Sequence, residues 1–128
     1  MISLLNRRAF VRWLVAANAV YYLFTGLWPL LDINSFMIVT GPKTDLWLVK
    51  MVGCLAASSG ICMLYSALRK EFPPLLFLLG IVNSLSFISV DVIYVLNGTI
   101  RSIYLLDATA EAFLLCIYIT LLRNTRTI

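Results

Sequence analysis

Apolar residues dominate the chain in four long runs, which short polar stretches separate. The runs cover about residues 13–31, 46–68, 74–96 and 103–122. Each is close to the length of about 20 residues that an α-helix needs to cross a bilayer's hydrocarbon layer. Inside a bilayer the backbone finds no water, so each run must satisfy its own hydrogen bonds as a helix. The pattern predicts four transmembrane helices.

The links between these runs predict one all-α membrane domain over residues 1–128, built as a four-helix bundle. Two links, 69–72 and 97–102, are so short that the helices they join must be antiparallel. The third link, 32–44, is too apolar for a free loop. We expect it to lie along the membrane interface or to fold back on the bundle before the Gly41-Pro42 turn.

The first run also has features of a cleavable signal peptide. Basic residues precede it, and Ala17-Asn18-Ala19 resembles a cleavage triplet. The apolar run continues well past that triplet, however, where a signal peptide would already have been cut. We therefore expect this run to be a retained membrane helix.

Composition and charge agree with a membrane protein and predict its orientation. Of the 128 residues, 62% are hydrophobic and 12% charged, about half the charged share of a soluble domain. Basic residues favour the cytoplasmic side of short loops. Lys43, Lys50 and Arg101 fall on one side of a four-pass topology, and the other seven fall with the two termini: Arg7, Arg8, Arg12, Arg69, Lys70, Arg123 and Arg126. Both termini are thus expected in the cytoplasm, and the net charge of +4 gives no reason to expect nucleic-acid binding.

Charged residues inside the predicted helices are the main functional signal. Asp91, Asp107, Glu111 and Lys50 all lie within apolar runs, and Glu111 is about 13 Å past Ser102 along its helix. A charge at the centre of a membrane helix costs at least ~2.5 kcal/mol and normally faces a partner or a water-filled cavity. These residues therefore mark a candidate site.

Helical spacing places these charges on faces shared with other polar and aromatic residues. Asp107 and Glu111 are four residues apart, and Tyr104 lies one turn away. Similar faces occur on the other three helices, mostly in their outer halves. We predict that they line a polar pocket that opens outward. Its expected ligand-binding residues are Tyr22, Lys50, Asn83, Asp91, Tyr94, Arg101, Tyr104, Asp107 and Glu111.

The charges within this pocket do not balance. Lys50 and Arg101 face three carboxylates, if Lys43 and Asp45 offset each other near the surface. One carboxyl group is then expected either to hold a proton or to bind a cationic or hydrogen-bond-donating ligand. A purely structural network is the alternative, because buried ion pairs can simply fix helix register.

Other residue types exclude several kinds of chemistry. The chain has no histidine, and its three cysteines, Cys54, Cys62 and Cys116, form no Cys-x-x-Cys motif. We expect no metal site and no cofactor. Small residues on the second run, Gly53, Ala56, Ala57 and Gly60, predict close helix packing within the bundle or in a homodimer.

Several short segments resemble the DoxX-like family of small membrane proteins. They are residues 23–29 (LFTGLWP), Thr40-Gly41-Pro42, the small-residue helix from Gly53 to Gly60 and the acid in the fourth helix. The resemblance implies a four-helix bundle in a bacterial cytoplasmic membrane, with links to redox partners, sulfur metabolism or the assembly of other membrane proteins. It carries over no catalytic residue. The acidic site is also similar in kind to those of emopamil-binding proteins, by analogy of chemistry alone.

Three classes of function remain open. The leading interpretation is that the outward-facing pocket binds a small or amphipathic ligand. We also expect the chain to act together with a partner membrane protein. The second is an enzyme that acts on a lipid-like substrate by carboxyl acid/base chemistry, and the third is a proton-coupled transporter. An enzyme predicts turnover in detergent, a transporter predicts pH-dependent flux, and a binding protein predicts neither.

Overall fold

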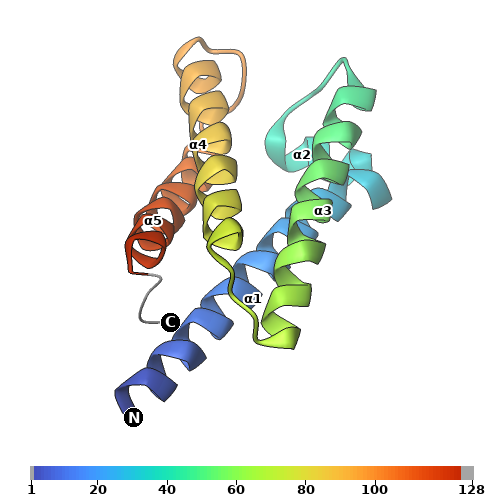
Figure 1. Ribbon diagram of the computed structural model, residues 1–128. Helices are drawn as coiled ribbons and strands as arrows, with labels where there is room; N and C mark the ends of the chain where they lie inside the picture. Colours follow the sequence, from blue (N-terminus) through green and yellow to red (C-terminus); the bar gives the residue numbers. More distant parts are fainter. Residues whose placement is uncertain (1, 125–128) are drawn as a thin grey trace. The chain divides into compact units, whose positions relative to one another are not determined.

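The computed structural model describes residues 2–124 and shows five helices (Figure 1). Arg126, which contributes to the predicted orientation, lies outside the described residues. Four of the helices are long and apolar enough to cross a membrane, which confirms the prediction of four such helices. The helices are α1 (Ile2–Leu31), α2 (Ile33–Thr40), α3 (Leu46–Arg69), α4 (Pro74–Leu96) and α5 (Tyr104–Arg123).

Helix α1 begins at Ile2, eleven residues before the apolar run from which it was predicted. The arginines in residues 2–12 lower the hydropathy of this segment, but they do not lower its helix propensity. Arginine, leucine and alanine are all good helix formers, and no glycine or proline interrupts the chain before Gly26. The helix therefore extends beyond the segment that hydropathy alone detects.

The apolar link after α1 folds as the short helix α2. The carboxylate of Asp32 accepts a hydrogen bond from the backbone N–H of Ser35 at 3.1 Å and caps the first turn. Gly41 ends the helix with a φ of 96°, which L side chains rarely adopt. Lys43, expected to offset Asp45, donates its Nζ to the carbonyl oxygens of Thr40 and Gly41 at 3.0 and 3.3 Å, where it stabilises this helix end.

The helices belong to two compact units, of which the first contains α1, α2 and α3. Helices α1 and α3 pack against each other in an antiparallel arrangement. Arg12 Nε donates to the carbonyl oxygen of Ala67 at 3.2 Å, and Asn18 Nδ2 donates to Met63 Sδ at 3.4 Å. Contacts thus move toward the start of α3 as the chain advances along α1.

Small residues let the backbones of α1 and α3 come close together. A Cβ atom on Gly53 would lie 2.5 Å from the carbonyl oxygen of Gly26, and one on Gly60 would lie 2.9 Å from that of Ala19. Ala56 and Ala57 are buried in the same face of α3. The prediction that this small-residue face packs against another helix is confirmed.

The second unit is a hairpin of α4 and α5. Pro74 occupies the first turn of α4, where its missing N–H leaves no bond unmade. Tyr118 is buried on α5, and its ring lies against Gly80 and 6.4 Å from the ring of Phe77, centroid to centroid. This aromatic contact joins the start of α4 to the later part of α5.

Candidate functional site

A buried polar pair crosses the hairpin of α4 and α5. Ser84 Oγ lies 2.6 Å from Glu111 Oε2 and donates a hydrogen bond to it. Ser84 is 0% exposed and Glu111 1% exposed. Such a short O–H···O distance is typical of a hydrogen bond to a carboxylate. The two helices thus hold the side chain of Glu111 in a defined position inside the unit.

Asp91 lies on the same face of α4 as Ser84, two helical turns further along. The seven residues between them correspond to about 10 Å along the helix axis. Asp91 is 4% exposed, and within residues 2–124 its Oδ2 atom is buried without a hydrogen-bond partner. The side-chain nitrogen of Asn83 is also buried without a partner in that part of the chain. This hairpin therefore holds a buried acceptor and a buried donor that the described protein atoms do not satisfy.

The register of the hairpin places Asp91 level with the beginning of α5. Because Ser84 faces Glu111 across an antiparallel pair, the position seven residues after Ser84 is level with Tyr104. Tyr104 is half-buried, and so is Asp107, one turn before Glu111. Asp91, Tyr104, Asp107, Glu111 and Ser84 therefore share one hairpin, and we call them the acidic seam.

The remaining predicted site residues lie in other environments. Tyr94 is half-exposed on α4, and Arg101 is exposed in the link between α4 and α5. Lys50 on α3 is exposed, and Tyr22 on α1 is buried; both belong to the first unit. Within residues 2–124, neither Asp91 nor Asp107 takes part in an ion pair, whereas exposed Arg69 and Glu71 form one of 3.8 Å.

Ser84 is the residue of the seam that sequence reasoning missed. Serines in membrane helices commonly bond to their own backbone, as Ser86 and Ser89 do in α4. The available signal was spacing, because Ser84 precedes Asp91 by seven residues and so shares its face. Spacing alone does not show that Ser84, rather than another serine of α4, forms the bond to Glu111.

A hollow of about 330 Å³ lies in the first unit and shares no residue with the seam. It is lined by Asn34, Met37, Ile38 and Pro42, on α2 and the turn that follows it. These residues are mostly apolar, and none of them belongs to the predicted site. The described residues contain no cluster of three or more histidine, cysteine or acidic side chains that could hold a metal ion.

Comparison with known proteins gives no further assignment, since no protein-family model, curated protein or solved structure matches this chain. The chemistry of the seam is therefore the basis for a functional assignment. A buried carboxylate oxygen without a donor is costly in an apolar environment. Such a group calls for a proton or for a donor that comes from another molecule.

Proposed function

We propose that this chain is a multi-pass membrane protein that binds a small or amphipathic ligand at the acidic seam. The observation that carries the proposal is the buried Oδ2 of Asp91, which has no hydrogen-bond partner within residues 2–124. A ligand with an amine or hydroxyl group would supply the donor that this atom lacks. An amphipathic ligand would also place its apolar part among the lipid-facing residues of the helices.

Three further features of the site favour a ligand with a hydrogen-bond donor. Glu111 is already held by Ser84, and a carboxylate can accept several hydrogen bonds, so it offers a second, fixed acceptor. Tyr104 adds an aromatic side chain that favours cationic groups. Asp107 adds a third carboxyl group one turn from Glu111. Together these groups suit an amine better than an anion.

The proposal includes a membrane topology. The four long helices form one bundle in a bacterial cytoplasmic membrane, with both termini in the cytoplasm and the seam open toward the outer side. The excess of basic residues at the ends that would face the cytoplasm supports this orientation. A second copy of the chain or another membrane protein completes the assembly.

Ligand retention tests the proposal directly. The protein is extracted with its native lipids, and the masses that remain bound are measured for wild type, Asp91→Asn and Asp45→Asn. Asp45 is an exposed carboxylate at the start of α3 that forms no side-chain capping bond, so it is a matched control. We expect Asp91→Asn to lose a ligand that wild type and Asp45→Asn retain. Equal retention by all three proteins would contradict a binding role for Asp91.

A defined probe then tests the chemistry of the site. Dodecylamine carries N–H donors, whereas dodecyltrimethylammonium has the same chain and charge but no N–H group. We expect dodecylamine to raise the melting temperature of wild type more, and this difference to disappear in Asp91→Asn. Substrate turnover in detergent would favour the enzyme class instead, and pH-dependent flux in vesicles would favour the transporter class.

A further inference from the structure

Five cations gather at one end of the first unit, at the start of α1 and the end of α3. Antiparallel packing joins these two segments, because Arg12 Nε donates to the carbonyl oxygen of Ala67 at 3.2 Å. Glu71 lies at the same end, 3.8 Å from Arg69. We call this group the basic end. Its cations are Arg7, Arg8, Arg12, Arg69 and Lys70.

The opposite end of the same unit is electrically balanced. Two acids, Asp32 and Asp45, lie there with two lysines, Lys43 and Lys50. After residue 72 the sequence contains three arginines and three acidic residues, so the net charge of that part is zero. The chain's net charge of +4 is therefore the charge of the basic end. A positive surface of this density fits an anionic partner.

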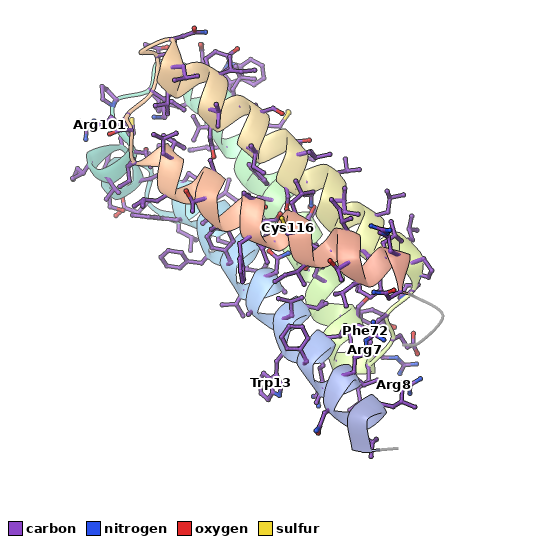
Figure 2. All side chains as sticks on the ribbon, turned by 90° about the vertical axis from the view of Figure 1, so that its left-hand side faces the viewer. Arg7, Arg8, Trp13, Phe72, Arg101 and Cys116 are labelled. Atoms are coloured by element: carbon purple, nitrogen blue, oxygen red, sulfur yellow. The ribbon has the colours of Figure 1, made fainter. Side chains whose placement is uncertain are left out.

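The length of α1 places these charges in the headgroup layer of a membrane. Its 30 residues span about 45 Å, about 15 Å more than the hydrocarbon layer. Trp13 is 72% exposed and points away from α1 (Figure 2), as expected for a side chain at the membrane interface. Arg7 and Arg8 lie beyond it, toward the start of the helix, at the end of the unit that also carries Phe72 (Figure 2).

Lys70 occupies a backbone position that suits a lysine poorly. Its φ of 59° is left-handed, and it ends α3 by donating its N–H to the carbonyl oxygen of Ser66. Glycine or asparagine adopts this conformation with less strain. A lysine here places a cation just past the last carbonyl groups of α3, beside Arg69.

We infer that the basic end binds the phosphate group of an anionic phospholipid. Guanidinium groups match phosphate oxygens in pairs, and Arg12 is half-buried and held by its bond to Ala67. The neighbouring interfacial tryptophan places the site at the depth of lipid headgroups. The basic end shares no residue with the acidic seam, and the inference does not depend on the proposed ligand.

Tryptophan quenching in bilayers tests this inference at each end of the first unit. One reporter keeps only Trp13 (Trp28→Phe, Trp47→Phe), and a second keeps only Trp47 (Trp13→Phe, Trp28→Phe). Both reporters lose the hydrogen bond from Trp28 to Ser35. This loss is therefore the same in the two proteins that are compared. Quenching is measured with brominated phosphatidylglycerol or brominated phosphatidylcholine in otherwise identical vesicles. We expect Trp13 to be quenched preferentially by the anionic lipid, and Trp47 to be quenched equally by both.

Charge-removing variants then assign the preference to named residues. In the Trp13 reporter, Arg7→Gln and Lys70→Asn should each lower the preference for the anionic lipid about fivefold. Asparagine tolerates the left-handed backbone, so Lys70→Asn is expected to keep the fold. Lys50→Gln removes an exposed cation at the balanced end and should change nothing.

Three results would each overturn the inference. The first is equal quenching of Trp13 by both lipids, and the second is an equal loss of preference in Lys50→Gln and Lys70→Asn. The third is loss of the preference when sodium phosphate replaces sodium chloride at matched ionic strength, which would show a site for free phosphate.

Discussion

Ser84 and Glu111 show how a single hydroxyl group can hold a charged side chain in an apolar hairpin. Glu111 is buried and accepts the 2.6 Å hydrogen bond from Ser84. Hydrogen bonds to charged groups contribute about 1.5–3 kcal/mol. We expect Ser84→Ala to lower the free energy of unfolding in detergent by about this amount. Ser86→Ala is the matched control, since Ser86 is exposed and its hydroxyl group donates to the carbonyl oxygen of Val82 in its own helix. Similar melting of both variants would show that the pair adds little to stability.

Asp91 is the residue whose expected environment changed most. From the sequence, two cations are available for three carboxylates, and Asp91 is expected to be one of the paired acids, so that removing its charge would leave a cation without its partner. Within residues 2–124, Asp91 forms no ion pair. Asp91→Asn removes a buried charge at nearly constant shape, so we expect thermal melts in ligand-free detergent to show equal or higher stability. A clear drop in melting temperature would indicate a partner for Asp91.

At the scale of the element, α2 depends on a titratable cap. The hydrogen bond from the Ser35 backbone N–H holds the pKa of Asp32 below its usual 3.8, and the side chain of Ser35 acts in the same direction. A lowered pKa in the folded state means that the cap stabilises α2 above pH 3.8 and is lost as the pH falls through the folded-state pKa. Hydrogen-exchange protection of the Ser35 amide, corrected for the intrinsic rate, should therefore fall below pH 3.8. In Asp32→Asn this pH dependence should be absent.

Helices α1 and α3 approach closely because of their glycines. A methyl group on Gly53 would lie 2.5 Å from the carbonyl oxygen of Gly26, and backbone atoms cannot move aside cheaply. Overpacking of this kind typically costs 1–3 kcal/mol, so Gly53→Ala should lower the melting temperature in detergent. Ser58→Ala places the same side chain on the exposed face of α3 and should have little effect. If Gly53→Ala melts like wild type, the two helices are less tightly packed than described.

At the scale of the whole molecule, the proposed topology, in which all four long helices cross the membrane, places both termini on the same side. In a background without cysteine, a single cysteine at Asn6 should resist an impermeant thiol reagent in intact cells, whereas one at Thr99 should react. Thr125, which would report on the other terminus, lies outside the described residues. Labelling of the cysteine at Asn6 from outside would reverse the proposed orientation.

The sequence by itself determined the number and approximate bounds of the long helices. Three of them agree with their predicted bounds to within one residue, because polar links and the Pro73-Pro74 pair bound the apolar runs. A long apolar run in a bilayer must satisfy its own backbone hydrogen bonds, so the hydropathy of the run alone indicates a helix there. The small-residue face of α3 was also readable, because glycine and alanine repeat at helical spacing. The start of α1 was missed, because helix propensity rather than hydropathy sets that end.

Only the tertiary structure decided which side chains meet. Nearly every face of these helices is apolar, so hydrophobic periodicity does not show which face packs inward. The partner of Gly53 on α1, the donor to Glu111 and the burial of Asp91 each depend on the register between two helices. That register results from the summed contacts along both helices, to which residues far apart in the sequence contribute. For this reason the acids of the seam could be read from the sequence, and Ser84 could not.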